Sequence, residues 1–368
     1  MAIRSSALEG LVTMGRPDSG FWRGRKVLLT GHTGFKGSWL TLWLTRLGAD
    51  VIGVSLPAET NPNLFSEANV GDFVRKSVFL DIRDAAELAS VVRQENPEVV
   101  IHLAAQPLVR LSYSQPIETF ATNVMGTVHL MESIRGVASV RVAVMVTSDK
   151  VYANREWGLP FREEDTLGGH DPYSASKAAS EIVIDSYRQA FLGAQGVMVA
   201  SARAGNVIGG GDWSIDRLIP DAVRAWETRT ALSIRRPDAV RPWQHVLEPL
   251  AGYLVLAQRL WTGEAAPGAY NFGPHSHEAV SVREVASLAT EVWGDGAQVT
   301  HDEQGTGPHE ARLLTLETAR ARCQLDLLPR WDARTAIRRT LEWYQAHRRG
   351  QRASDLCNMD ISAYEAEA

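Results

Sequence analysis

The chain of 368 residues has little of what marks secreted, membrane or nucleic-acid-binding proteins. It contains two cysteines, Cys323 and Cys357, which are too few for a disulfide framework or a zinc site. No apolar run approaches the roughly 20 residues that a membrane span needs. The formal net charge of -5 gives no broad basic surface for nucleic acid. We therefore expect a globular protein of a reducing compartment, the cytoplasm, with no membrane, nucleic-acid or metal partner.

The sequence does contain a regular alternation of strand-like and helix-like segments. Short runs rich in β-branched residues at 26–30, 50–54, 99–103, 142–146 and 197–200 indicate buried parallel strands. Segments of helical length lie between them at 38–47, 85–95, 117–135 and 175–191. This alternation is typical of an α/β fold with a doubly wound, Rossmann-type parallel sheet.

A glycine-rich loop, Gly31-His32-Thr33-Gly34-Phe35-Lys36-Gly37, joins the first strand to the first helix. At such a position the first glycine allows a tight turn, the second lets the backbone approach a pyrophosphate, and the third lets the helix pack on the sheet. The amides at the start of the helix then face the phosphates. The loop predicts a bound dinucleotide.

The choice of dinucleotide rests on residues at the strand ends. Asp81 and Ile82 follow a third strand, where a carboxylate could accept a hydrogen bond from the adenine amino group; otherwise Asp81 is a solvated loop acid. A carboxylate for the adenosine ribose is expected about 20 residues after the loop, but residues 54–57 contain none. His32 and Lys36 could pair with phosphate, including a 2′-phosphate. We predict NAD, with NADP not excluded.

Two further motifs carry groups that can move protons. Tyr173 and Lys177 are four residues apart and share one face of a helix. A nearby ammonium and a positive nicotinamide ring favour the phenolate of Tyr173, which could then accept a proton from a hydroxyl group. The alternative is an ordinary amphipathic helix start with a surface lysine. The Asp149-Lys150 pair, next to Ser148, suggests additional proton transfers.

These motifs resemble the extended short-chain dehydrogenase/reductase family of nucleotide-sugar epimerases and dehydratases. The similar segments are 31–39, 102–107, 123–127, 147–152, Tyr173 with Lys177, 203–213 and 241–245. The glycine loop, the Ser-Asp-Lys triplet and the Gly-Gly-Gly-Asp-Trp stretch point to the CDP-glucose branch. The resemblance implies conversion of CDP-glucose to a 4-keto-6-deoxy sugar with NAD, or, as the alternative, another 4,6-dehydration or a 4-epimerisation.

The resemblance also implies a role for each catalytic residue. Tyr173 would remove the C4 hydroxyl proton while hydride passes to NAD, and Ser148 would hydrogen-bond O4. Asp149 would protonate the departing C6 hydroxyl and Lys150 would take the C5 proton. The dTDP-glucose dehydratases carry glutamate where this chain has Lys150, and an ammonium must first lose its proton to act as a base. Alternatively, Lys150 anchors Asp149 or the enolate oxygen, and water or another group is the base.

The resemblance implies two sets of binding residues. The cofactor set is Gly31, His32, Gly34, Phe35, Lys36, Gly37, Asp81, Ile82, Leu103, Ala104, Ala105, Thr122, Tyr173 and Lys177. The substrate set is Gln106, Ser148, Asn206, Arg217, Arg241, Asn271 and Glu310, in which the arginines pair with the pyrophosphate. For each arginine the alternative is a solvated surface side chain.

We expect the chain to divide into four parts. A flexible N-terminal tail over 1–20 lacks the apolar centre of a secretory signal, and the NAD-binding Rossmann domain follows over 21–205. A smaller α/β domain for the nucleotide sugar covers 206–345, with some elements returning to the first domain and a last helix at 334–348. A polar C-terminal tail covers 346–368.

The resemblance finally implies a homodimer or a dimer of dimers. In the family two long helices from each subunit form a bundle, and segments 117–135 and 175–191 correspond to them. Apolar residues on the side of Asn123, Val124, Thr127, Val128 and Met131 could form the seam. Packing against the sheet would use the same periodicity.

Overall fold

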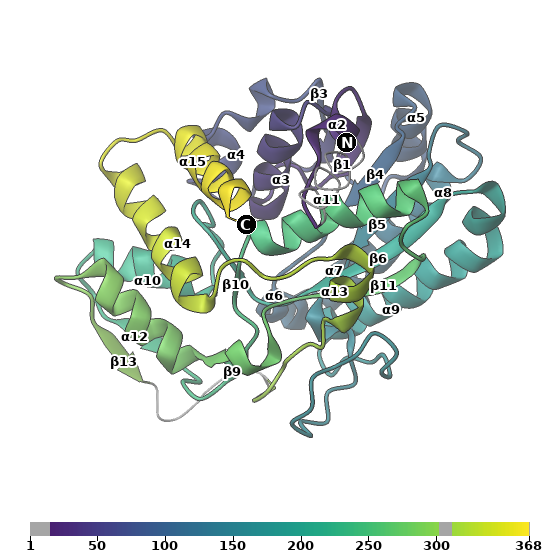
Figure 1. Ribbon diagram of the computed structural model, residues 1–368. Coiled ribbons are helices and arrows are strands. Elements are labelled where there is room, and N and C mark those ends of the chain that lie inside the picture. The colour runs from purple at the N-terminus through teal and green to yellow at the C-terminus, as the bar shows by residue number, and fades with distance from the viewer. Residues whose placement is uncertain (1–14, 302–310, 368) are drawn as a thin grey trace, which may run out of the picture.

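The computed structural model describes residues 15–301 and 311–367, and it is built on one seven-stranded sheet (Figure 1). The strand order is β11-β6-β5-β4-β1-β2-β3, and all neighbours are parallel. The strands are β1 Lys26–Thr30, β2 Asp50–Ser55, β3 Lys76–Phe79, β4 Val99–His102, β5 Val142–Val146, β6 Met198–Ala204 and β11 Gly268–Phe272. The predicted Rossmann-type sheet is confirmed.

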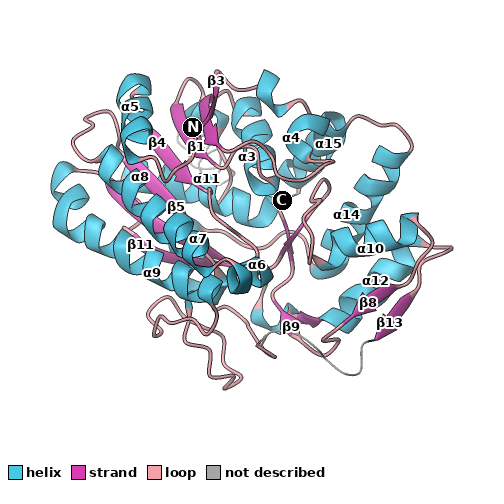
Figure 2. Ribbon diagram, turned by 180° about the vertical axis from the view of Figure 1, so that it is seen from behind, coloured by secondary structure: helices cyan, strands magenta, loops and turns pink. Residues whose placement is uncertain are grey.

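Helices cover both faces of this sheet (Figure 2). One face carries α3 Phe35–Arg46 and α11 Leu247–Thr262, and the other carries α5 Ala85–Glu95, α8 Gly126–Ile134 and α9 Pro172–Tyr187. Successive side chains of a strand point to opposite faces. In β1, Leu29 accordingly belongs to one hydrophobic core and Leu28 to the other.

Two predicted helices are longer than a single α-helical element. The helix α7 Pro116–Phe120, the π-helical turn Ala121–Met125 and α8 follow one another without a break. The helix α9 continues directly into a second π-helical turn, Arg188–Leu192. The predicted helical segments 117–135 and 175–191 are therefore confirmed within a few residues.

The strand order reverses between β1 and β4, because the chain runs outward from β1 through β2 to β3 and then returns to β4. In open parallel sheets, ligands bind in the crevice at the carboxyl ends of the strands at such a switch point. The glycine loop leaves β1 at this place, and Leu103 to Ala105 leave β4 beside it. The topology thus positions the predicted cofactor loop at the crevice.

The remaining elements form a smaller α/β region with three short strand pairs. These are β7 Val207–Ile208 with β10 Gln244–His245, β8 Leu232–Ile234 with β13 Val299–His301, and β9 Val240–Arg241 with β12 Val280–Ser281. Its main helices are α10 Leu218–Glu227, α12 Val282–Trp293 and α14 Ala333–Arg348. Further short helices among the described residues are α2 Ser19–Trp22, α4 Leu64–Glu67, α6 Val109–Ser114 and α13 Ala319–Leu325. Both α11 and β11 return to the large sheet. The division at residue 205 stays a prediction.

The predicted polar tail after residue 345 is wrong, because α14 runs to Arg348 and a further helix, α15 Ala353–Ala366, follows it. Its buried stripe is Leu356, Cys357, Ile361 and Tyr364. The helix lies against α3, where Trp43 Nε1 donates to Glu365 Oε1 at 2.8 Å (Figure 1). The spacing of this stripe is helical and was readable from the sequence.

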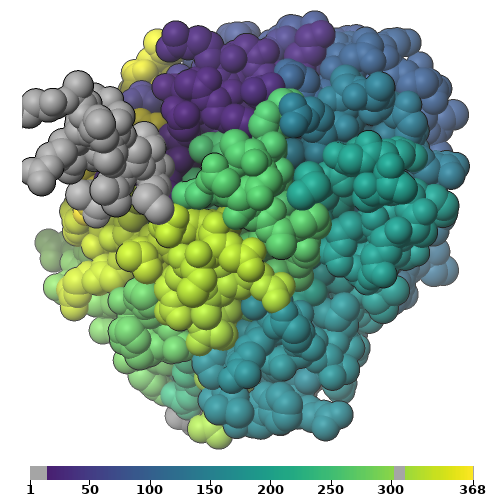
Figure 3. Space-filling view, turned by 45° about the vertical axis from the view of Figure 1, so that its right-hand side comes forward, coloured from purple at the N-terminus to yellow at the C-terminus, as the bar shows by residue number. Residues whose placement is uncertain are grey.

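The predicted flexible N-terminal tail over 1–20 is wrong for residues 16–20, which are held by hydrogen bonds. Residues 1–14 lie outside the described residues, but α2 begins at Ser19 with Asp18 as its N-cap. Arg16 donates to the backbone oxygen of Glu367 at 2.9 Å. Figure 3 shows the N-terminal, middle and C-terminal segments of the chain joined in one continuous surface.

Candidate active site

The glycine loop after β1 brings three backbone segments closer than a side chain would allow. Gly31 has a φ of +79°, and a Cβ there would lie 2.7 Å from Ala104 N. A Cβ on Gly37 would lie 1.9 Å from Gly31 O. Gly34 is the N-cap of α3 and makes no side-chain cap bond, and the first turn carries no acidic residue. The start of α3 therefore offers amides to an anion, which fits the pyrophosphate of a dinucleotide.

His32 within the loop does not carry the charge that was predicted for it. Its ring is buried, with Nε2 2.7 Å from Ser77 Oγ of β3. Desolvation lowers the pKa of His32 to about 4, so the imidazole is neutral at pH 7. A Cβ on Gly53 of β2 would lie 2.4 Å from the ring. His32 fills space beneath β2, and the prediction of a charge pair with phosphate is wrong for it.

Lys36 reaches the neighbourhood of the predicted catalytic groups. Its charged neighbours are Arg217, Asp149, Lys177 and Lys150. Desolvation and then repulsion by Arg217 lower the pKa of Lys36 to about 7, against the attraction of Asp149. An amine with this pKa can exchange a proton at neutral pH. Whether Lys36 also contacts the cofactor, as predicted, stays a prediction.

The predicted adenine end of the site lies after β2 and β3. Asp81 directly follows this part of the chain and forms an ion pair with Arg83 at 2.7 Å, which holds the pKa of Asp81 below its usual value. Ile82 is buried and packs against Gly126, where a Cβ would lie only 2.4 Å from Ile82 Cδ1. At the end of β2, Ser55 Oγ lies 2.8 Å from Thr33 Oγ1. Hydroxyl groups thus stand where a ribose-binding acid is usual.

Ser148, Asp149 and Lys150 follow β5 as one hydrogen-bonded group. Ser148 Oγ donates to Asp149 Oδ1 at 3.1 Å and accepts from Lys150 N at 3.2 Å. Lys150 Nζ forms an ion pair with the same Asp149 oxygen at 3.0 Å. Asp149 Oδ2 is buried and has no hydrogen-bond partner among the described residues. A buried oxygen without a partner is costly, so Oδ2 is the atom that a bound substrate can satisfy.

Tyr173 and Lys177 lie on the first two turns of α9, which starts with Asp171 as its N-cap. Both side chains are buried, with 8% and 6% exposed. Desolvation raises the pKa of Tyr173 above its usual value of 10, although Ser148 and Arg217 act in the opposite direction. Desolvation lowers the pKa of Lys177 to about 8, against the attraction of Glu181. The protein alone therefore does not produce the expected phenolate, and further positive charge is needed.

The predicted substrate side contains a cavity of about 170 Å³ between the loop after β6, α10 and β8. Four arginines line it: Arg217, Arg235, Arg236 and Arg241. Asn206 also lines it, and its Oδ1 is buried without a hydrogen-bond partner among the described residues. Guanidinium groups in this number suit a diphosphate. Three of the predicted substrate residues, Asn206, Arg217 and Arg241, thus meet at one cavity.

The sequence comparisons agree with this geometry. A sequence model of a family described as GDP-mannose 4,6 dehydratase matches residues 28–348. The CDP-glucose 4,6-dehydratase of Salmonella typhimurium is 47% identical over 353 residues, which cover 94% of this chain and 98% of that protein. The chain belongs to the extended short-chain dehydrogenase/reductase family of nucleotide-sugar epimerases and dehydratases.

Two other relatives span most of the chain. The dTDP-glucose 4,6-dehydratase of Shigella flexneri is 26% identical over 348 residues, covering 88% of this chain and 93% of that protein. The solved structure of MoeE5 in complex with UDP-glucose and NAD superposes with a TM-score of 0.73 at 25% identity, covering 88% of this chain and 99% of that one. The chain is thus similar to both dehydratases and other nucleotide-sugar proteins.

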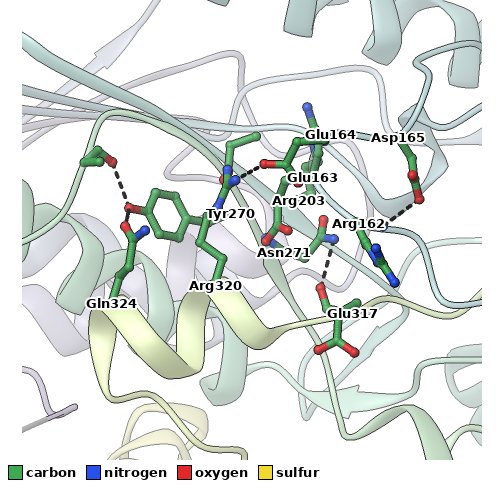
Figure 4. Close-up of polar contacts among 12 residues, drawn as sticks. Arg162, Glu163, Glu164, Asp165, Arg203, Tyr270, Asn271, Glu317, Arg320 and Gln324 are labelled. Carbon is green, nitrogen blue, oxygen red and sulfur yellow. Dashed lines mark hydrogen bonds and ion pairs between the residues drawn. The ribbon is translucent and has the colours of Figure 1, made fainter.

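One predicted substrate residue of this epimerase/dehydratase lies in the wrong place. Asn271 is fully buried in β11, where its Nδ2 donates to the backbone oxygens of Phe161 and Glu317, and its Oδ1 accepts from Tyr152 at 2.6 Å (Figure 4). Its side chain has no atom left for a phosphate. The predicted contact is wrong because Tyr152, Phe161 and Glu317 already use the hydrogen-bonding atoms of this side chain. Glu310 lies outside the described residues.

Gln106 is held by its own neighbourhood. Its Nε2 donates to Thr119 Oγ1 at 2.9 Å, and its Oε1 accepts from Leu108 N at 2.5 Å. Its backbone N–H donates to Asn123 Oδ1, beside Thr122 on the π-helical turn. These contacts fix the loop that follows β4, and a substrate contact by Gln106 stays a prediction.

Sequence reasoning missed three features of this family member's site. The Arg235-Arg236 doublet was visible as a basic cluster, but nothing in the sequence placed it beside Arg217. Lys36 was assigned to phosphate because its loop binds phosphate, whereas its ammonium lies near Asp149. Glu181 was not considered, although it stands one helical turn after Lys177.

Two kinds of site are missing from the part of the chain that the structure describes. No helix there is long and apolar enough to cross a membrane. No cluster of histidine, cysteine and acidic side chains there could hold a metal ion.

Proposed function

We propose that this chain is a CDP-glucose 4,6-dehydratase that uses NAD without consuming it. The observation that carries the proposal is the placement of the Asp149-Lys150 pair beside Ser148 and Tyr173 in one buried site. A tyrosine and a lysine are enough for oxidation and reduction at C4, whereas loss of water from C5 and C6 needs an added acid and base. The likeness to the Salmonella protein supports the choice of CDP-glucose.

The start of α3, Ser55 and the loop after β4 would hold NAD at the switch point. When bound, NAD accepts hydrogen from C4 of the sugar, returns it to C6, and places a positive ring near Tyr173. The positive ring favours the phenolate, so Tyr173 can take the C4 hydroxyl proton. Ser148 then donates to O4 and holds the sugar against the site.

Asp149 is suited to the acid role because its Oδ2 is buried and accepts no hydrogen bond from the described residues. Oδ2 lies close to the backbone of the next strand end, where a Cβ on Gly205 would be 3.2 Å away. A proton on this oxygen can be given to the departing C6 hydroxyl. Oδ1 meanwhile keeps its contact with Lys150, which fixes the orientation of the carboxyl group, while the Ser148 hydroxyl turns from Oδ1 to O4 of the sugar.

Lys150 is the base that we propose for the C5 proton, acting in its neutral form. Its ion pair with Asp149 is the contact expected of an anchor, so the anchor role is the second candidate. Transfer of one proton from Lys150 to Asp149 within this ion pair would give the neutral amine and the carboxylic acid that the two roles need. Lys36 is a third candidate because its pKa lies at about 7.

The product spectrum tests the proposed reaction. With CDP-glucose we expect a CDP-4-keto-6-deoxy sugar and no net consumption of NAD, and lower kcat/KM with dTDP-, UDP- or GDP-glucose. Substrate deuterated at C4 should give product with the label at C6, because the same hydrogen returns to the sugar.

A C4 epimer as the only product would instead show a 4-epimerase, and loss of the label to solvent would contradict internal transfer. Mass spectrometry and proton NMR of the product distinguish these outcomes. The arginine-lined cavity predicts a diphosphate-linked sugar in each case.

We also propose that the enzyme is a homodimer or a dimer of dimers. Large apolar side chains are exposed on α7, the π-helical turn and α9, with Ile117 80% and Ile182 61% exposed. Phe120, Met125 and Phe191 are exposed as well. Apolar side chains gathered on one face of a structure indicate a contact with another protein surface. The helices that carry them are those that pair in the family.

Three of the five predicted seam residues need a correction, whereas Val124 and Val128 are half-buried. Asn123, Thr127 and Met131 are buried within the subunit, where Asn123 Nδ2 donates to Ser176 Oγ at 2.9 Å and Met131 packs in the core under the sheet. Their side of the helix faces α9 and the sheet. The exposed side, with Ile117, is the one available for a second subunit.

Aspartate in place of Ile182 should therefore split the assembly, because a carboxylate cannot be buried in an apolar seam without a partner. Light scattering at micromolar concentration should show the mass of one chain for this variant and a multiple of it for the unchanged protein. Leu328→Asp is the matched control, since Leu328 is 58% exposed away from these helices. A monomeric unchanged protein would exclude the proposed assembly.

A further inference from the structure

A buried carboxylate that plays no part in the reaction above lies directly behind the catalytic lysine. Glu181 belongs to α9, one turn beyond Lys177, and only 4% of it is exposed. Its Oε2 accepts from Arg203 at 2.7 Å and from Ser201 Oγ at 2.7 Å. Its Oε1 accepts from Thr147 Oγ1. Both oxygens are thus fixed by donors from β6 and from the end of β5.

These contacts join the segments that carry the reacting groups. Glu181 stands on the helix of Tyr173 and Lys177, and Thr147 immediately precedes Ser148. Arg203 is at the end of β6, before the loop that lines the substrate cavity. One carboxylate therefore connects the helix, the catalytic triplet and the substrate loop.

Arg203 is itself locked on its other side. Its guanidinium donates to Tyr152 OH at 2.9 Å, and Tyr152 OH donates in turn to Asn271. The guanidinium also donates to the backbone oxygen of Glu163, which lies near Arg203 in Figure 4. The ion pair between Arg203 and Glu181 is buried on both sides, with 4% of each side chain exposed. A buried pair of this kind is a weak source of stability, because desolvation offsets the attraction. The ion pair can instead hold the neighbouring segments in place and keep a negative charge on Glu181.

The charge of Glu181 acts on Lys177. Among the described groups, Glu181 is the one that favours the ammonium form of Lys177, whose pKa desolvation has lowered to about 8. The other titratable groups near Lys177 are His102 at the end of β4, buried and neutral, Lys36 of α3, and Tyr173 on the same helix. Asp149, Asp171 and Arg217 surround Tyr173. Without Glu181, Lys177 would be surrounded by cations and neutral groups.

We propose that Glu181 is a positioning residue of the reaction, held by Arg203, Thr147 and Ser201 so that Lys177 stays protonated beside Tyr173. The proposal rests on the proposed function in so far as Tyr173 and Lys177 carry the reaction. It adds a residue that touches neither sugar nor cofactor. Its effect passes through the charge of Lys177.

The lysines of the chain make this effect directly measurable. There are five, Lys26, Lys36, Lys76, Lys150 and Lys177. Enzyme labelled with carbon-13 at the lysine ε position gives few signals, which arginine substitutions at Lys36, Lys150 and Lys177 assign. In Glu181→Gln we expect the Lys177 titration midpoint to fall by roughly 1 unit or more. The alkaline limb of kcat should move to lower pH with it, because the rate needs the protonated lysine, while KM changes little.

Three further variants separate charge from folding. Glu181→Asp keeps the charge, so the midpoint should stay near that of the unchanged enzyme even if Tm falls. The double variant Glu181→Gln with Arg203→Met removes both buried charges, leaves no lone guanidinium, and should show the lowered midpoint if the single variant does not fold. Glu248→Gln removes another buried acid, on α11, and should leave Lys177 unchanged.

A Lys177 midpoint and an alkaline limb that stay in place in Glu181→Gln, with only Tm reduced, would overturn the proposal and leave a structural role. If the Lys177 midpoint falls in Glu181→Gln but the unchanged enzyme forms no keto sugar from CDP-glucose, the proposed function is rejected and this inference is kept. The NMR measurement needs no substrate, so the two failures are distinguishable.

Discussion

Tyr173→Phe is expected to lower kcat by roughly 10²–10⁴-fold, the range that a positioned acid or base contributes. The substitution removes one hydroxyl from a side chain that is 8% exposed, so the ring still fills its place at the start of α9. It removes the phenol group that is proposed to take the C4 proton, and the proposed reaction needs Lys177 to stay charged, so that Lys177 does not replace it. Steady-state formation of the keto sugar measures the loss.

The structure offers a matched control for this experiment. Tyr187 lies on the same helix, near its end, where its ring packs on Phe191. Tyr187→Phe removes the same hydroxyl at a distance from the site and should keep normal turnover. Melting curves of both variants should be similar. Normal turnover in Tyr173→Phe would remove Tyr173 from the mechanism.

Lys150→Ala is expected to stop exchange of the C5 proton with solvent and to lower kcat by a similar factor, because the proposed base is gone. Oxidation at C4 needs only Tyr173 and the cofactor and should persist. Deuterium entry at C5, followed by NMR in heavy water, measures the effect. Lys150→Arg should be as inactive, since a guanidinium keeps its proton near neutral pH.

The competing roles give different results in the same assay. An active Lys150→Arg enzyme would show that the cation anchors Asp149 and is not the base. Lys36→Met addresses the third candidate. If Lys150 is the base, exchange of the C5 proton should persist in this variant. Loss of C5 exchange in Lys36→Met would assign the base to Lys36.

The parts of the structure that local patterns determine were predictable. The strand β1, the glycine loop and α3 follow from a buried apolar run, a positive φ that favours glycine, and a helical stripe. The pairing of Tyr173 with Lys177 follows from helix geometry. These features depend on residues that are close in sequence.

The failures concern contacts between distant segments. The family resemblance implied that Asn271 binds the substrate, but its hydrogen-bond partners are residues 152, 161 and 317. His32 was predicted to pair with phosphate, but in the structure its ring is enclosed by β2 and bonded to Ser77. The periodicity of residues 123–131 identified a buried side of the helix, but it could not show whether the sheet or a second subunit covers that side. Tertiary packing decides each of these cases.

The helix α15 has a consequence for the way the chain unfolds. It closes the outer side of α3, the helix whose first turn is built for phosphate, and Tyr364 donates to Glu248 of α11 at 2.9 Å. The last residues of the chain thus complete the packing of its first βαβ unit. Residues 21–205 alone would lack this helix, so Trp43, which is fully buried in the structure, would lose the cover and the hydrogen bond that α15 gives it.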